Sequence, residues 1–243
     1  MSVRLDTWLA LHKYFESREK ARIAIEEGTV EVNGQLIFKT SFKVAPHDQI
    51  EIKAPALRYV SRGGLKLEKA IRAFQLNFTD KIILDIGAST GGFTDCALQH
   101  GAAKVFAIDV GSDQLHPSLR IHPRVKWWEN LHIRDLTAEM LGELVDIIVV
   151  DVSFISLRHV FPYLNIFLKK DSFIITLIKP QFELEEKVRL KKGIIKDEKL
   201  RQQVLEKVIV AAQAHGFALK MLVATDAEEE KKNTEYLAWW ESF

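Results

Sequence analysis

The stretch at 82–93, IILDIGASTGGF, is the feature that most constrains what this chain can fold into. It begins with a short apolar run rich in β-branched residues, which is typical of a strand buried on both faces of a parallel sheet. Glycines at 87, 91 and 92 follow, and they allow a sharp turn and the close approach of a ligand to the backbone before a helix begins. The stretch therefore predicts a strand, a cofactor-binding turn and a helix.

The spacing within this turn indicates which cofactor it would bind. A dinucleotide fingerprint needs a second glycine where this chain has Ser89, so close approach of a pyrophosphate is disfavoured. Asp109 follows a second apolar run, at the place of an acid that bonds ribose hydroxyls about 20 residues after the first glycine. S-Adenosylmethionine, which has a ribose but no phosphate, fits both observations; the plainer interpretation is a tight turn with Asp109 capping the next helix. The expected cofactor contacts are Asp85, Gly87, Ala88, Ser89, Gly91, Gly92, Phe93, Asp109 and Val110.

Units of strand and helix repeat after this turn. Apolar runs predict strands at 104–108, 125–128, 145–150, 173–178 and 218–223. A helix is expected at 198–214, and another, at 65–74, precedes the turn. Strands that alternate with helices predict an α/β fold with a parallel, doubly wound sheet, in which ligands bind outside the carboxyl ends of the strands.

Charged residues follow two of the predicted strands. Asp151 comes directly after the strand at 145–150, and Lys179 follows the strand at 173–178. Taken singly, Asp151 is also suited to cap a helix, and Lys179 has Glu183 nearby in sequence as an ion-pair partner. An acid and a lysine at neighbouring strand ends beside a cofactor turn nevertheless mark a candidate functional site.

Two further charged residues join this candidate site. Glu235 opens a last strand-like run that ends at Trp240. Lys66 lies near the start of the predicted helix and off its apolar face, where a cation is unfavourably placed in the field of the helix dipole. That position points to a role other than local stability, although an ordinary solvated lysine remains the alternative.

Bulk composition limits the class of protein. A chain of 243 residues with 47% hydrophobic residues can bury a sizeable core, in one large or two modest domains. Its apolar runs are far shorter than a membrane span, it begins without an apolar signal core, and its one cysteine cannot form an internal disulfide. We therefore expect a cytoplasmic protein without a membrane partner. The formal net charge is only +1, so a nucleic acid would have to be bound by a local basic face.

The first 53 residues predict a small α+β domain. Residues 4–28 show the pattern of two short helices, and VEVNG at 30–34 predicts a β-hairpin because Asn-Gly favours its tight turn. Acids such as Asp6 and Glu19 lie among the basic residues, so a solvated surface of mixed charge competes with RNA binding. The expected contacts to RNA phosphates are Arg4, Lys13, Arg18, Lys20 and Arg22, to which we add Arg62.

The order of short motifs in this segment favours the RNA interpretation. RLD at 4–6, SRxKA at 17–21, VxVNG at 30–34 and DxI at 48–50 resemble the small RNA-binding domain named after the fourth protein of the small ribosomal subunit. The resemblance implies a helix pair that docks on structured RNA. Pro55 then disfavours helix and a central strand, so we expect domains at 1–53 and 62–243, joined by a linker at 54–61.

Five motifs resemble one known family over nearly the whole chain. They are RYVSRGGLKLE at 58–68, LDIGASTGGFTD at 84–95, DVG at 109–111, DVSFIS at 151–156 and IKPQFE at 178–183. These motifs resemble the TlyA family of hemolysin-named ribosomal RNA methyltransferases. The resemblance implies an FtsJ-like catalytic domain with a Rossmann-like sheet, which moves a methyl group from S-adenosylmethionine to a ribose 2′-hydroxyl, in that family on cytidine. The family's catalytic set falls on Lys66, Asp151, Lys179 and Glu235.

The chemistry that the resemblance implies suits these residue types. A ribose hydroxyl is a poor nucleophile at neutral pH, so transfer needs in-line placement and relief of charge on the developing alkoxide, and no metal is needed. Lys179 would either accept the proton or stabilise the oxyanion, with Lys66 as its neighbour and Asp151 orienting it. The implied partner is ribosomal RNA or a ribosomal subunit.

Departures from the family pattern keep two alternatives open. The run at 130–132 has Asn, Leu and His where the family has Arg, Thr and Asn, and the segment at 226–232 lacks the family's proline and glycines. One alternative is therefore an RNA-binding protein with a catalytically impaired methyltransferase domain. A membrane-lytic hemolysin is less favoured, because the chain has neither a spanning segment nor a long apolar amphipathic helix.

Overall fold

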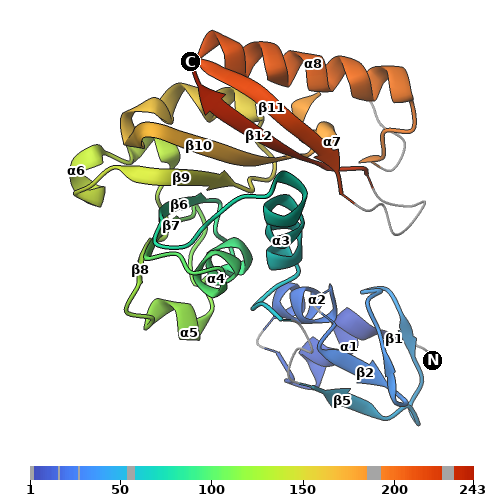
Figure 1. Ribbon diagram of the computed structural model, residues 1–243. Coiled ribbons are helices and arrows are strands. Elements are labelled where there is room, and N and C mark those ends of the chain that lie inside the picture. Colours follow the sequence, from blue (N-terminus) through green and yellow to red (C-terminus); the bar gives the residue numbers. More distant parts are fainter. Residues whose placement is uncertain (1–2, 16, 27, 54–57, 185–192, 226–232) are drawn as a thin grey trace. The chain divides into compact units, whose positions relative to one another are not determined.

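The computed structural model describes residues 3–15, 17–26, 28–53, 58–184, 193–225 and 233–243 (Figure 1). The chain divides into two compact units, residues 1–62 and 63–243, and each is described by itself. Residues 54–57, which include Pro55 of the expected linker, lie outside the described residues.

The N-terminal unit contains two helices and short antiparallel strands. Its elements are β1 (Val3–Arg4), α1 (Leu5–Leu11), α2 (Arg18–Glu26), β2 (Val30–Val32), β3 (Gln35–Leu36), β4 (Lys43–Val44) and β5 (Ile50–Ile52). Strand β1 pairs with β4, and β2 lies between β3 and β5. The expected helix pair and hairpin are confirmed, with positive φ at both turn residues, Asn33 and Gly34. Apolar side chains of both helices and of β2 and β4 form the core of this unit.

The C-terminal unit is built around a seven-stranded sheet. In chain order its elements are α3 (Gly63–Phe74), β6 (Ile82–Ile86), α4 (Gly92–Gln99), β7 (Lys104–Ile108), α5 (Pro117–Arg120), β8 (Val125–Trp128), η1 (Ile133–Asp135), α6 (Ala138–Leu141), β9 (Val145–Val150), η2 (Leu157–His159), η3 (Phe161–Tyr163), η4 (Asn165–Phe167), β10 (Leu168–Ile178), α7 (Pro180–Glu183), α8 (Glu198–Ala214), β11 (Phe217–Ala224) and β12 (Tyr236–Ser242). The expected strands at 104–108, 125–128 and 145–150 and the helix at 198–214 are confirmed to the residue. Strand β10 begins earlier than expected, and its register shifts between Leu168 and Phe173.

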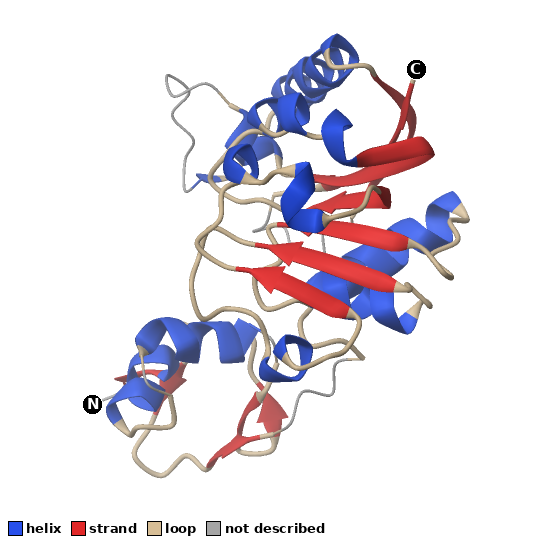
Figure 2. Cartoon of the chain, turned by 90° about the vertical axis from the view of Figure 1, so that its left-hand side faces the viewer, coloured by secondary structure: helices blue, strands red, loops and turns tan. Residues whose placement is uncertain are grey.

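The strand order is β11-β12-β10-β9-β6-β7-β8 (Figure 1). Figure 2 shows the strands in red and the helices in blue. The five strands from β10 to β8 are parallel, as expected. The sheet departs from the expected parallel arrangement at β12, which runs antiparallel to both β10 and β11. The segment at 225–235 connects β11 to β12, and the two strands pair directly as antiparallel neighbours.

Helices cover both faces of the sheet, because successive side chains of a strand point to opposite faces. Two neighbouring tryptophans of β12 show this alternation. The ring of Trp239 lies 6.2 Å from Phe74 of α3, whereas the ring of Trp240 lies 5.5 Å from Phe161 of η3. The face of Trp240 carries a cluster that includes side chains of α8 and of the short helices η2–η4. The sheet is therefore doubly wound, and its loops are left to form a site at the strand ends.

None of the helices in the described part of the chain combines the length and hydropathy that crossing a membrane requires.

Candidate active site

The predicted site residues lie along one edge of the sheet, where the parallel strands end. The pairing registers bring Ile178 opposite Tyr236, and Val150 opposite both Thr176 and Ile86. Because β12 is antiparallel, its first residues lie at the same edge as the last residues of β10. The order along the edge is therefore Glu235, Lys179, Asp151, Gly87 and Asp109.

The glycine turn follows β6 as expected and packs tightly against the next strand end. Gly87 has φ +82°, and a Cβ there would lie 2.4 Å from the backbone oxygen of Asp151. Asp109 holds the turn in place: its Oδ2 accepts the Ser89 N–H at 2.7 Å and its Oδ1 accepts the Gly111 N–H at 2.7 Å. The turn, the end of β7 and the end of β9 thus form one rigid corner.

A pocket of about 500 Å³ opens at this corner. Its volume is within the roughly 300–1,000 Å³ typical of small-molecule sites. Most of its walls are apolar, and two carboxylates, those of Asp109 and Asp151, reach it. The expected contacts that line it are Gly87, Ser89, Asp109 and Val110.

The other expected cofactor residues support the pocket from behind. Gly91 packs against the side chain of Leu119, and Ala88, Gly92 and Phe93 are buried. Asp85 does not reach the pocket surface, so the expectation of a direct contact is wrong for its side chain. It occupies a position of β6 that points toward α4, where its Oδ2 accepts a hydrogen bond from the Thr94 hydroxyl at 2.6 Å.

Burial raises the pKa of Asp85 to about 7. The hydrogen bond from Thr94 opposes this shift, and the nearby carboxylates of Asp151 and Asp109 reinforce it. Oδ1 of Asp85 is also buried without a hydrogen-bond partner among the described residues. The acid therefore carries a proton below neutral pH and sits as a mostly neutral group beneath the pocket.

Lys179 and Asp151, which the sequence placed at neighbouring strand ends, form an ion pair. Nζ of Lys179 lies 2.5 Å from Oδ1 of Asp151 and donates a hydrogen bond to Oγ of Ser153 at 2.9 Å. Both paired side chains are largely buried. Asp151 therefore faces the pocket and the lysine at once, so it links the cofactor side of the site to the lysine.

The alternative partner of Lys179, Glu183, makes different contacts. Its buried carboxylate accepts hydrogen bonds from the Ser156 hydroxyl and from the Leu157 N–H. Arg158 donates to the Glu183 carbonyl oxygen at 3.2 Å and to Ser156 Oγ at 3.0 Å. Glu183 thus ties the loop after β9 to the segment after β10, and so helps to fix both members of the Lys179–Asp151 pair.

Lys66 and Glu235 form a second ion pair at the same edge. Nζ of Lys66 donates to Oε2 of Glu235 at 2.7 Å, and both side chains are partly buried. The pair joins α3 to the start of β12 across 169 positions of sequence. Each of the two lysines of the predicted catalytic set thus forms an ion pair with a different acid of that set. The segment at 226–232, which departs from the family pattern, lies outside the described residues.

Sequence reasoning missed an aromatic pair beside this site. Phe154, in the loop after β9, is 90% exposed and has φ +64°, an unusual backbone conformation for a bulky residue. Its ring lies 4.9 Å from that of Phe182 in α7. An aromatic residue within the motif that follows Asp151 is a signal that could have identified it. Gln114, which was not among the expected contacts, also lines the pocket, as do Leu131 and His132 of the run at 130–132 that departs from the family pattern.

The expected phosphate contacts of the N-terminal unit fall into three groups. Arg4 and Arg18 bind a shared acid, Asp6. We expected Asp6 to belong to a solvated surface of mixed charge, but its side chain is buried. Arg22 pairs with Glu19 on the exposed face of α2, and the guanidinium of Arg62 lies over the ring of Phe38 at 4.2 Å. The remaining residues, Lys13 and Lys20, are exposed.

Two family models match the chain over the two units. One, described as S4 domain, matches residues 3–50, and the other, described as FtsJ-like methyltransferase, matches residues 59–242. The chain belongs to the FtsJ-like methyltransferase family. The predicted fold class and enzyme class are therefore confirmed.

Members of known sequence and structure support this assignment. The chain is 44% identical to hemolysin A of Brachyspira hyodysenteriae, over 97% of this chain and 98% of the relative. It is 37% identical to the 16S/23S rRNA (cytidine-2′-O)-methyltransferase TlyA of Mycobacterium tuberculosis, over 97% and 88%. A hemolysin-named structure from Streptococcus thermophilus is similar with a TM-score of 0.77 and 38% identity, over 99% of this chain and 88% of that one. The resemblance to the TlyA family is confirmed.

Proposed function

We propose that this protein transfers a methyl group from S-adenosylmethionine to a ribose 2′-hydroxyl of ribosomal RNA, with cytidine as the expected nucleoside. The observation that carries the proposal is the Lys179–Asp151 ion pair at the rim of an acidic pocket. A lysine held there is suited to handle the proton or the charge of a sugar hydroxyl that reacts beside the pocket.

The pocket suits the proposed cofactor. Bound there, S-adenosylmethionine would supply an electrophilic methyl group on a positively charged sulfonium. Two carboxylates and apolar walls favour such a cationic nucleoside, and the described lining residues include no lysine or arginine to attract a phosphate. Both oxygens of Asp109 already accept backbone N–H groups, but a carboxylate has about four acceptor sites, which leaves capacity for ribose hydroxyls.

The residues beside the pocket would position the RNA and the reacting oxygen. Lys179 is oriented by Asp151 and Ser153, so its ammonium group has a fixed direction before substrate binds. As an ammonium, Lys179 would stabilise the developing alkoxide; as a neutral amine, after loss of its own proton, it would accept the proton of the hydroxyl. The exposed ring of Phe154, which lies against the half-buried ring of Phe182, offers a stacking surface for an unpaired base, the form in which RNA bases are usually recognised.

Support for ribosomal RNA as the substrate comes from the N-terminal unit and the relatives. The S4 match covers the unit that carries most of the expected phosphate contacts. The Mycobacterium tuberculosis relative, matched over almost the whole of this chain, is named as a methyltransferase of 16S and 23S rRNA. The presence of both ion pairs of the predicted catalytic set favours an active enzyme over the RNA-binding alternative.

The test is methyl transfer from labelled S-adenosylmethionine to undermethylated ribosomal RNA, followed by mass spectrometry of the nucleosides. We expect 2′-O-methylcytidine to appear only when the protein is present. Cofactor binding without transfer to ribosomal RNA or to either ribosomal subunit would support the catalytically impaired alternative. Methyl groups found on a base and not on the ribose would contradict the proposed role of Lys179.

A further inference from the structure

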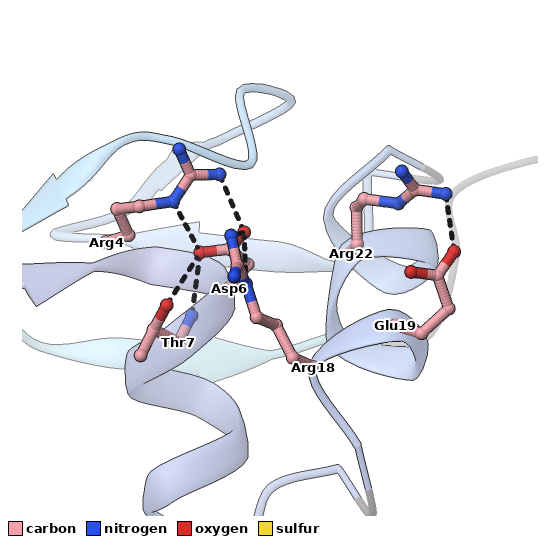
Figure 3. Close-up of polar contacts among 6 residues, drawn as sticks. All are labelled: Arg4, Asp6, Thr7, Arg18, Glu19 and Arg22. Atoms are coloured by element: carbon pink, nitrogen blue, oxygen red, sulfur yellow. Dashed lines mark hydrogen bonds and ion pairs between the residues drawn. The ribbon is translucent and has the colours of Figure 1, made fainter.

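The N-terminal unit contains a buried acid that binds two arginines. Asp6, the second residue of α1, has 0% exposure. Arg4 donates from Nε and Nη2 to its two carboxylate oxygens at 3.0 and 2.7 Å, and Arg18 donates from Nε and Nη2 to Oδ2 at 3.1 and 3.0 Å (Figure 3). The N–H and the hydroxyl of Thr7 donate to Oδ1 at 2.8 and 3.2 Å. Two cations that would otherwise repel each other thus converge on one carboxylate.

The bonds to Asp6 leave each arginine able to bind a second anion. A guanidinium has five N–H donors, and Asp6 takes two from each residue, so the remaining donors are directed away from the carboxylate. The arginine side chains are 38% and 59% exposed, so these donors are accessible to a ligand. Two guanidiniums against one carboxylate also leave a local excess of positive charge.

We propose that Asp6 is a positioning residue, which holds Arg4 and Arg18 side by side as a preformed fork for the phosphates of an RNA backbone. Arginine forks match the geometry of phosphate oxygens, and their long side chains lose much conformational freedom when they are fixed. Because Asp6 fixes them before RNA arrives, this loss is not incurred on binding. The inference rests on the proposed RNA substrate and adds to it a residue that would not itself touch RNA.

Asp6 is suited to this role because it stays ionised. Hydrogen bonds from Arg4, and then those from Arg18 and Thr7, outweigh the effect of burial and hold the pKa of Asp6 well below its usual value. A second acid–arginine pair of the same unit lacks these features. Glu19 and Arg22, three positions apart on α2, form this pair (Figure 3). Their side chains are 64% and 49% exposed, and such exposed pairs contribute little to fixing a side chain.

This difference gives a matched pair of variants with opposite expected outcomes. Asp6→Asn and Glu19→Gln each remove one negative charge from the same unit, so electrostatic attraction alone predicts that both bind RNA more tightly. If Asp6 positions the fork, Asp6→Asn instead weakens binding by about tenfold, since two side chains must now be ordered on binding. The measurement is filter binding of the full-length protein to 16S and 23S rRNA transcripts over a range of salt concentrations. Tighter binding by both variants would overturn the proposal.

A cycle of variants separates positioning from a general loss of structure. Asp6→Asn is combined with Arg4→Gln and Arg18→Gln in one chain and compared with the chain that carries only the two arginine changes. A residue that acts through the arginines causes no further loss of affinity in their absence. An additional tenfold loss there would show that Asp6 supports the fold of the unit and does not act through the fork.

Steady-state methylation kinetics distinguish the loss of one positioning residue from the unfolding of the whole N-terminal unit. We expect Asp6→Asn to raise the KM for RNA while leaving kcat at saturating RNA and the affinity for S-adenosylmethionine unchanged. Binding of rRNA without any methyl transfer would contradict the proposed enzyme but leave the fork intact. Failure of the unmodified protein to bind rRNA would overturn both.

Discussion

Asp6 and Asp85 are both completely buried, one in each unit of the chain, yet they have opposite electrostatic surroundings. Asp6 binds two guanidiniums, and the pKa of its carboxyl is lowered. Asp85 has one hydroxyl partner and lies near two other carboxylates, and burial raises its pKa to about 7. Burial alone therefore does not decide the charge of an acid in this protein; it raises the pKa of Asp85, but the two guanidiniums beside Asp6 outweigh it there.

The same contrast distinguishes the ligands that the two units can attract. Around Asp6 the cations outnumber the acid, which favours an anion such as RNA phosphate. The pocket above Asp85 presents the carboxylates of Asp109 and Asp151, which favours a cation such as a sulfonium. The lysines beside the pocket are each paired with an acid, so they do not reverse its character. The following predictions test this division, from the largest expected effect to the smallest.

Replacement of Lys179 should have the largest effect. Lys179→Ala removes the group that meets the developing alkoxide, so we expect single-turnover methyl transfer to slow by about 10²-fold or more. The affinities for cofactor and RNA should stay nearly unchanged. Lys179→Arg should not restore the rate, because a guanidinium has a different shape and does not release its proton. Labelled cofactor and undermethylated rRNA, with enzyme in excess, provide the measurement.

Two other lysines serve as comparisons for this variant. Lys220 on β11 also pairs with an acid, Glu241 at 3.1 Å, but outside the site, and Lys220→Ala should transfer at the normal rate. Lys66→Ala should lose less activity than Lys179→Ala if Lys66 acts through its charge or through RNA contact. An unchanged rate for Lys179→Ala would remove this residue from the mechanism.

Loss of Asp109 should weaken cofactor binding. Asp109→Ala removes the acceptor for the ribose hydroxyls and for the N–H groups of Ser89 and Gly111. We expect a loss of about 1–3 kcal/mol in S-adenosylmethionine binding by calorimetry. RNA affinity, which we assign largely to the N-terminal unit, should not change. Tighter binding of a nicotinamide dinucleotide than of S-adenosylmethionine by the unmodified chain would contradict the assignment of the pocket.

The two buried acids should respond to pH in opposite directions. The folded pKa of Asp85 lies above its ordinary value of 3.8, so the native state retains a proton that the unfolded state loses, and stability falls as pH rises from about 4 to about 7. The folded pKa of Asp6 is lowered, so its stabilising contribution is present above the ordinary value of 3.8 and is lost as pH falls below it.

Isosteric variants measure these contributions. The stability of the unmodified chain relative to Asp85→Asn should decrease by at least about 1 kcal/mol between pH 4 and 7, since one unit of pKa shift corresponds to about 1.4 kcal/mol. The stability of the unmodified chain relative to Asp6→Asn should decrease as the pH is lowered below about 4. Hydrogen exchange at amides of β6 and of α1 reports on each unit separately. The same pH trend for both variants would mean that the contrast between the acids is wrong.

The smallest expected effect is that of one arginine of the fork. Arg18→Gln should lower the slope of log affinity against log salt concentration by about one, the amount expected for one lost phosphate contact. Lys39→Gln, at an exposed position of the same unit that is not among the expected phosphate contacts, provides the comparison. An equal change of slope for both variants would indicate a diffuse basic surface without a fork.

Much of the fold could be predicted because local patterns encode it. The apolar runs and the glycines at 82–93 were sufficient for a strand, a turn and a helix, and those elements formed with nearly the expected bounds. Asp151, Lys179 and Asp109 were placed at one edge because parallel strands end together. The direction of β12 was not predicted, yet it is this reversal that brings Glu235 to the edge beside Lys179.

The sequence by itself determined which elements form and which chemistry is available, because the spacing of apolar residues and glycines acts over a few positions. Only the tertiary structure decided the partners of the charged residues. Lys179 binds Asp151 and not Glu183, although Glu183 is closer to it in the sequence. Lys66 binds Glu235, which lies near the other end of the chain. From the sequence alone, Asp6 is indistinguishable from an acid on the surface. In the folded unit it is buried and binds two arginines. Such pairings depend on distances that exist only after the chain has folded, so no local pattern records them.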